Sequence, residues 1–231
     1  AMMRMSINGL RKNMSENITK EYFLEMLDEA EALFSNDSLM EEHDSYLYSL
    51  TTPQKVEDKP YKEDVSSCHK CEACFSRRVY AEPILNKEPK LFFILPSPEG
   101  DTLFSPESSL YFSKWLSAMN IERKEIAVSS LIKCPVKAFS REIASVCKDH
   151  LKEEMLSIKP KALVLLGENV AQYMLRKNVP FDELRRKTYT INGITTFCTY
   201  SPLDLTNNRG LRAPIWEDLK FIMSSIGDEK A

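Results

Sequence analysis

Three short apolar runs, each followed by a helical pattern, constrain most strongly what this chain can fold into. The runs are KLFFILP at residues 90–96, IAVSSLI at 126–132 and ALVLL at 162–166. They are largely apolar throughout, which predicts strands buried on both faces. Helical patterns follow at 108–119, 141–158 and 168–175. This alternation predicts an α/β fold, a three-layer αβα sandwich around a central, mainly parallel, four-stranded sheet.

The remaining C-terminal segments complete this pattern. Extended pieces at 187–191 and 194–200 flank Asn192-Gly193, which predicts a β-turn. Residues 213–226 predict the last helix, with Pro214 near its first turn. In open α/β folds ligands bind at the carboxyl ends of the strands. We therefore expect functional residues in the loops after Leu95, Ile132 and Tyr200.

The N-terminal part of the chain differs in charge from the rest. Residues 1–66 carry 7 Lys and Arg against 14 Asp and Glu, a net charge of −7, whereas residues 67–231 carry 24 against 20, a net charge of +4. Apolar spacing at 18–34 predicts an amphipathic helix, and a polar stretch with prolines follows it. We expect an acidic helical extension and linker at 1–66, with a short helix near the centre of the linker, and a mildly basic domain at 67–231.

Bulk composition narrows the class of protein. The net charge of −3 argues against a broadly basic nucleic-acid binder, although the basic domain is compatible with a local phosphate-binding face. No stretch approaches the roughly 18 apolar residues of a membrane span, and the first residues lack the apolar core of a signal peptide. We therefore expect a cytoplasmic protein without a membrane partner. Reducing conditions there favour metal binding or catalysis over disulfides for clustered cysteines.

Cysteine spacing is the most specific local signal. CHKCEAC at residues 68–74 holds three of the six cysteines, and Cys134 and Cys147 follow in the second strand–helix unit. Soft thiolate ligands suit zinc or an iron–sulfur cluster. A redox dithiol fits poorly because the Cys-x-x-Cys pair does not lie between a strand and a helix start. Cys198 lies in an apolar strand, which predicts a core residue.

Four segments together resemble the uracil-DNA glycosylase superfamily, most closely its iron–sulfur branch, family 4. They are CHKCEACFSRRV, SSLIKCPV, EIASVCKDHLKEEMLSIKPKALVLLGENVA, and TYSPLDL with APIWEDLKFI. The resemblance covers residues 68 to about 225. It implies that Cys68, Cys71, Cys134 and Cys147 hold a 4Fe-4S cluster, with zinc as the alternative. Cys74 is left over as a substitute ligand. The resemblance also implies DNA as a partner; protein partners are not indicated.

The chemistry of that family requires particular groups around an extruded base. A donor stabilises the departing base anion, and a carboxylate or an aligned water faces the cationic sugar. A side-chain amide reads the edge of uracil, and an aromatic ring stacks on its face. Phe104 lies where the stacking ring is expected, although a core phenylalanine is an equal alternative.

Three positions that carry this chemistry in the family differ here. Pro96 replaces the glutamate of the first loop, Ser130 replaces the asparagine that reads uracil, and Ser201-Pro202 replaces a His-Pro-Ser sequence. A hydroxyl cannot offer the paired donor and acceptor of an amide. The remaining catalytic candidates are Glu99 and Asp101, three and five positions after Pro96, and the weak donor Ser201.

Basic residues near the three loops are candidates for contacts with DNA phosphates. They are Lys133, Lys137, Arg141, Arg185, Arg186, Arg209 and Arg212. Arg185 and Arg186 resemble an arginine that precedes the last strands of the family. The alternative is scattered surface charge.

Two functions are therefore consistent with the sequence. One is a DNA glycosylase with altered or lost uracil activity. The other is a noncatalytic DNA-binding or interaction module that retains the cluster and the fold. A zinc-stabilised protein of unrelated function is a third alternative.

Overall fold

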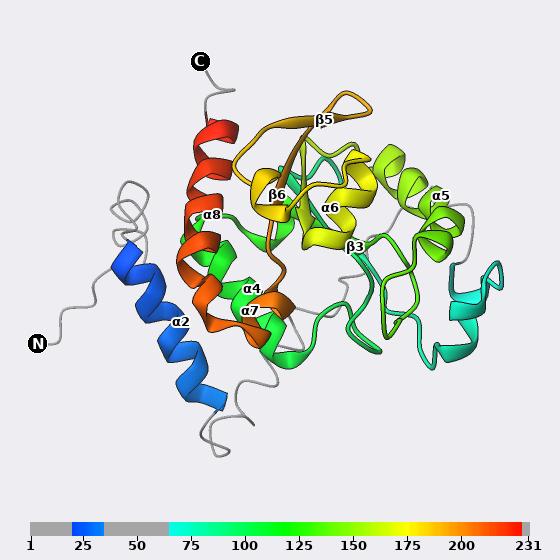
Figure 1. Ribbon diagram of the computed structural model, residues 1–231, viewed down its shortest axis with the longest axis horizontal. Coiled ribbons are helices and arrows are strands. Elements are labelled where there is room, and N and C mark those ends of the chain that lie inside the picture. The colour runs from blue at the N-terminus through cyan, green and yellow to red at the C-terminus, as the bar shows by residue number, and fades with distance from the viewer. Residues whose placement is uncertain (1–19, 35–64, 228–231) are drawn as a thin grey trace, which may run out of the picture.

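The computed structural model describes residues 20–34 and 65–227, and its core is a six-stranded sheet (Figure 1). The strand order is β1-β3-β2-β4-β6-β5. The four strands β3, β2, β4 and β6 run parallel, as predicted. Two short antiparallel strands, β1 beside β3 and β5 beside β6, extend the sheet at its edges. The three-layer fold is thus confirmed, with six strands in place of the four expected.

Most strands and helices lie close to the segments predicted from the sequence, and β1 and α7 were not predicted. The strands are β1 (Ile84–Leu85), β2 (Leu91–Leu95), β3 (Ile126–Ser130), β4 (Ala162–Leu166), β5 (Tyr189–Ile191) and β6 (Ile194–Thr199). The helices are α2 (Lys20–Phe34), α4 (Pro106–Ala118), α5 (Arg141–Ile158), α6 (Glu168–Leu175), α7 (Pro202–Asn207) and α8 (Arg212–Gly227). None of the described helices is long and apolar enough to cross a membrane.

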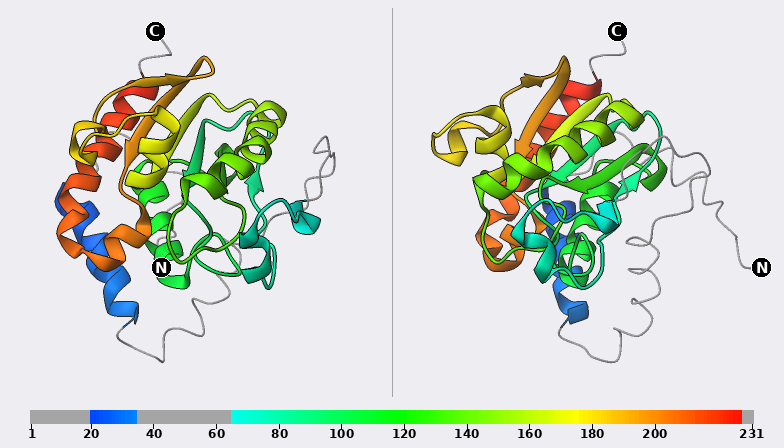
Figure 2. Two further views of the ribbon diagram at one scale, coloured as in Figure 1. Left: turned by 45° about the vertical axis from the view of Figure 1, so that its right-hand side comes forward. Right: turned by 90° about the vertical axis from the view of Figure 1, so that its right-hand side faces the viewer.

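The central strand β2 separates two apolar layers. Phe93 and its odd-numbered neighbours face α2, α4 and α8, whereas Phe92 and Ile94 face α5 and α6. Both sets are buried, which explains why β2 reads as one continuous apolar run. Figures 1 and 2 show α2 and α8 together on one side of the molecule and α5 on the other.

The N-terminal helix α2 packs on the domain. The Phe23 ring stacks on Trp216 of α8 with 4.9 Å between centroids, and Phe23 and Leu27 are both buried. Arg212 pairs with Asp28 across the same contact. The expected helix at 18–34 is therefore present from Lys20. The expected linker helix lies outside the described residues, and the division at residue 66 stays a prediction.

Candidate functional site

A cavity of about 460 Å³ opens at the carboxyl edge of the parallel strands. It is lined by Leu95, Pro96, Ser97, Pro98, Glu99, Ser105, Pro135, Val136, Lys137, Ser201 and Leu203. These residues come from the loops after β2, β3 and β6. The sequence prediction of three convergent loops is consistent with this placement, since three of the predicted site residues, Glu99, Lys137 and Ser201, line one cavity.

Glu99 is held in this cavity by the start of α4. Its Oε2 accepts a hydrogen bond from the Ser105 backbone N–H at 3.0 Å. Ser105 is also the N-cap of α4, where its hydroxyl accepts from the Ser108 N–H and Pro106 opens the helix. The other oxygen, Oε1, is buried and has no hydrogen-bond partner among the described residues. A buried carboxylate oxygen without a partner is costly, so this oxygen keeps an unused capacity to accept a hydrogen bond.

The other first-loop and pocket candidates lie elsewhere. Asp101 is exposed and does not belong to the cavity lining. Phe104 is buried and stacks on Phe112 with 4.8 Å between centroids, where it lines a separate cavity of about 20 Å³. Ser130 is buried at the end of β3, paired in register with Leu95. Neither residue lines the cavity at the carboxyl edge, and a base-pocket role for either stays a prediction.

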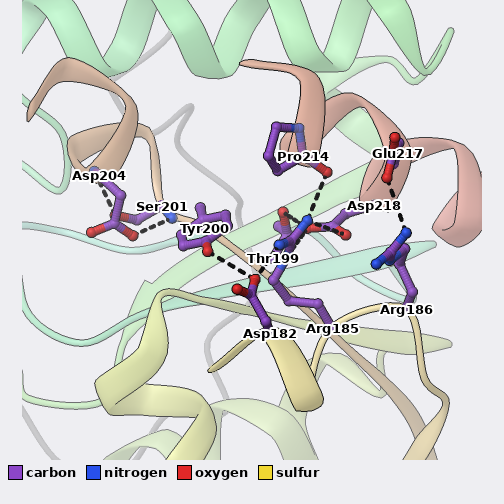
Figure 3. A network of polar contacts seen from close by, with 10 residues as sticks. All are labelled: Asp182, Arg185, Arg186, Thr199, Tyr200, Ser201, Asp204, Pro214, Glu217 and Asp218. Carbon is purple, nitrogen blue, oxygen red and sulfur yellow. Dashed lines mark hydrogen bonds and ion pairs between the residues drawn. The ribbon is translucent and has the colours of Figure 1, made fainter. Parts of the chain in front are cut away.

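Ser201 caps α7 beside the cavity. Its Oγ accepts from the Asp204 N–H at 3.1 Å, and its own N–H donates to Asp204 Oδ2 at 2.7 Å (Figure 3). These two bonds form a capping box. Gly167, at the end of β4, lies beside this turn and has φ +95°. A Cβ added there would lie 3.4 Å from Asp204 Oδ2, and a residue other than glycine would be strained at this φ. Ser201 is 5% exposed, and the cap uses its hydroxyl oxygen as an acceptor.

A buried ion pair lies next to the end of β6, where the same loop begins. Arg185 Nε donates to Asp218 Oδ2 at 2.8 Å and its Nη2 donates to Oδ1 at 3.1 Å (Figure 3). Thr199 adds a hydrogen bond to the Asp218 carboxylate at 2.8 Å, and Arg185 lies 4.6 Å from the Tyr200 ring centroid. Burial raises the pKa of Asp218, whereas Arg185 and Thr199 act in the opposite direction. The sequence did not reveal this network, because Asp218 lies 33 residues after Arg185 in an ordinary helical pattern.

The basic candidates divide by burial. Lys133 is 2% exposed and pairs with Glu154 at 2.7 Å, and Arg185 is 6% exposed and pairs with Asp218. The structure corrects our expectation for these two, because neither presents a free cation to a DNA strand. Lys137 lines the cavity, Arg209 is exposed, and Arg186 is exposed and pairs with Glu217 at 3.0 Å. These three remain candidates for phosphate contacts.

The cysteines gather where the start of the domain meets β3 and α5. Cys74 and Cys134 are buried in one small cluster with Cys71 against it, and Cys147 is buried nearby. Burial raises the pKa of the Cys134 thiol, Arg77 opposes this, and the charges of Cys71, Cys68 and Cys74 add to it. Burial also raises the pKa of Cys147 to about 11, with contributions from Cys71 and Cys134. Five cysteines, Cys68, Cys71, Cys74, Cys134 and Cys147, therefore lie in one neighbourhood of the domain.

The geometry of these thiols bears on what they can hold. Among the described residues no three His, Cys, Asp or Glu side chains form a group suited to a single metal ion. An iron–sulfur cluster has several irons and is therefore wider than one ion, and four thiolates are its ordinary ligands. Arg77 lies beside them, with Nη1 donating to Cys134 Sγ at 3.8 Å and to the Val65 carbonyl at 2.9 Å. Thiolates of this number suit either an iron–sulfur cluster or zinc.

Comparison with known proteins agrees with this architecture. The family described as Uracil DNA glycosylase superfamily matches residues 82–220. A type-4 uracil-DNA glycosylase of Saccharolobus solfataricus is 23% identical over 184 residues, covering 72% of this chain and 85% of its own. A type-4 uracil-DNA glycosylase of Archaeoglobus fulgidus is 20% identical over 183 residues, covering 72% and 92%. The family match spans more than half of the chain, and this chain belongs to the uracil DNA glycosylase superfamily.

Proposed function

We propose that this chain binds DNA at the carboxyl edge of its sheet and excises a damaged base there by hydrolysing the N-glycosidic bond, with altered or lost activity on uracil. Such a protein acts in base-excision DNA repair. The observation that carries the proposal is the Glu99 carboxylate, which lines a cavity of about 460 Å³ with one oxygen fixed by Ser105 and the other buried without a partner.

The cavity residues supply two of the required groups. Glu99 Oε1 accepts a hydrogen bond from the attacking water and its negative charge stabilises the cationic sugar. The Ser201 hydroxyl donates to the departing base, and Lys137 contacts a flanking phosphate. The described residues that line the cavity include neither Asn nor Gln, so none of them offers a side-chain amide to the base edge. This absence supports a substrate other than uracil.

The same absence favours the second candidate function, a noncatalytic DNA-binding or interaction module. Replacement of the family's glutamate, asparagine and histidine positions removes three groups at once, and losing one preorganised donor costs on the order of 10² to 10³ in rate. The two candidates differ in whether Glu99 takes part in chemistry.

Single-turnover assays separate them. Oligonucleotides containing uracil, hypoxanthine, xanthine or an alkylated base are presented in single- and double-stranded form. We expect excision of at least one base, slowed by about 10² in Glu99→Gln because a positioned acid–base group contributes 10²–10⁴. Asp101→Asn removes an exposed carboxylate from the same loop and should leave the rate unchanged. No excision of any base, with salt-dependent DNA binding intact, would establish the noncatalytic module.

We also infer that Cys68, Cys71, Cys134 and Cys147 hold a 4Fe-4S cluster. When bound, the cluster supplies a structural cross-link. Through these four cysteines, the first segment of the domain is held against the loop after β3, which carries Lys137. Iron and sulfide analysis together with visible absorbance tests the cluster. Colourless protein with stoichiometric zinc would support the alternative metal.

A further inference from the structure

A second and larger cavity lies between α5 and α6, on the opposite face of the sheet from α2 and α8. Its volume is about 740 Å³ and five of its lining residues are basic: Arg141, Lys148, Lys152, Arg176 and Lys177. One carboxylate, Asp149, also lines it. Figures 1 and 2 show α5 and α6 side by side there. We refer to this cavity as the α5–α6 groove.

The groove cations lie at the surface and are largely without ion pairs in the part of the chain that the structure describes. All five side chains are exposed. Among the described residues, Arg141, Lys148, Lys152 and Arg176 form no ion pair, and Lys177 lies over the Tyr189 ring at 5.0 Å. Like charges gathered in a concave surface raise the local positive potential and attract anions.

Helix ends account for only part of this charge. Arg176 and Lys177 follow the C-terminus of α6, where cations are favoured by the helix dipole. Arg141 is the first residue of α5, where the dipole disfavours a cation. Lys148 follows Arg141 by seven positions and Lys152 follows Lys148 by four, a spacing that keeps all three on one helix face. The stripe on α5 therefore has no explanation in helix stability.

The groove is connected to the reaction cavity by a short loop. Lys137 lines the cavity at the carboxyl edge, and Arg141 lines the groove. Three residues lie between them, so their Cα atoms are four steps apart, a span of at most about 14 Å. A polymer with regularly spaced negative charges can therefore contact both places at once, whereas a free anion cannot. Tyr173, half-buried in the groove wall, adds an aromatic surface of the kind on which bases stack.

We propose that the α5–α6 groove binds the phosphodiester backbone of a single nucleic-acid strand whose other end occupies the cavity at the carboxyl edge. The choice of polymer rests on the proposed function, but strand binding in the groove is independent of whether a base is excised. The chemistry that recognises the strand is the row of cations on α5, completed by Arg176 and Lys177.

The test compares strand length and charge. Binding of about 20-nucleotide and about 4-nucleotide single strands, without a damaged base, is measured by fluorescence anisotropy over a range of salt concentrations. We expect the double variant Lys148→Ala/Lys152→Ala to bind the long strand on the order of tenfold more weakly at low salt, and to bind the short strand as the wild type does. Its slope of log affinity against log salt should be shallower by about 1.4, because each lost phosphate contact removes about 0.7.

The control variant is Lys124→Ala/Lys161→Ala, which removes two exposed lysines outside the groove. It should match the wild type in both affinity and salt slope. The inference is overturned if the two double variants bind the long strand equally, if the wild type does not bind that strand at low salt, or if polyglutamate of equal charge competes as well as DNA. If the wild type excises no base but its salt slope is steeper than that of the Lys148→Ala/Lys152→Ala variant, the glycosylase proposal is refuted and strand binding in the groove is supported.

Discussion

Arg185 and Arg186 are neighbours in the chain but lie in opposite environments. Arg185 is buried and pairs through two nitrogens with a buried carboxylate, whereas Arg186 makes one exposed pair with Glu217. A bidentate guanidinium–carboxylate pair fixes geometry as well as charge. Because Arg185 also faces Tyr200, this pair determines where the chain leaves β6 and enters the turn at Ser201.

Substituting each arginine measures this difference. We expect Arg185→Met to lower the free energy of unfolding by about 3–5 kcal/mol, because it leaves Asp218 buried without its cation. Arg186→Met should lower it by less than about 1 kcal/mol, as for other exposed pairs. Urea denaturation of both variants provides the measurement. Equal losses would show that the buried pair does not stabilise the fold.

Cys198 provides a second prediction at the scale of one residue. Burial, with a smaller contribution from Asp218, raises the pKa of its thiol to about 12, and the side chain is 1% exposed. The ordinary thiol pKa is about 8.5, so folding keeps Cys198 protonated at pH values where an unfolded chain ionises it. We expect iodoacetamide at pH 8.5 to leave Cys198 unmodified in the folded protein and to modify it in urea. Mass spectrometry of peptides reads both states.

At the scale of elements, α5 and α7 both begin with a serine N-cap, but only α7 begins beside the cavity at the carboxyl edge. Ser201 caps α7 beside the cavity, and Ser140 caps α5, where its hydroxyl accepts from the Ile143 N–H at 3.2 Å. Substituting the two serines in turn therefore distinguishes an effect on helix stability from an effect on the reaction.

Ser201→Ala and Ser140→Ala should each lower the free energy of unfolding by about 1 kcal/mol, the ordinary cost of a lost cap. Only Ser201→Ala should also slow single-turnover excision, because only Ser201 lines the cavity. Denaturation and excision assays on the same preparations supply both readings. Equal slowing in the two variants would assign the effect to stability alone.

For the whole molecule, the thiol cluster connects the beginning of the domain to its centre. Residues 65–77 contact the rest of the domain at Cys134, which packs with Cys74 and accepts a hydrogen bond from Arg77, and Arg77 also binds the Val65 carbonyl within the segment. We expect Cys134→Ser to lose iron and visible absorbance, and to become more sensitive to trypsin after Arg77 or Arg78. Cys74→Ser should keep the iron. Full iron content in Cys134→Ser would contradict the proposed ligand set.

The sequence predicted the layers of this molecule better than its site. Continuous apolar runs such as Leu91–Leu95 identify buried parallel strands, because both faces of each strand must be apolar. The two-residue strand β1 has no periodicity that could be recognised. Lys133 looked like a surface cation because its partner, Glu154, lies 21 residues away on another element. Glu99 was recognised only as a weak alternative, since its support from Ser105 depends on how the loop folds back on α4.

The placement of α2 has an electrical consequence. This helix carries one lysine and five acidic residues and packs on the α4–α8 face, whereas the groove with five cations and one carboxylate lies on the α5–α6 face. Among the described residues, α2 and the groove thus place a negative and a positive group of charges on opposite faces of the sheet. A polyanion is repelled by the first and attracted by the second, so productive encounters at low ionic strength begin at the groove.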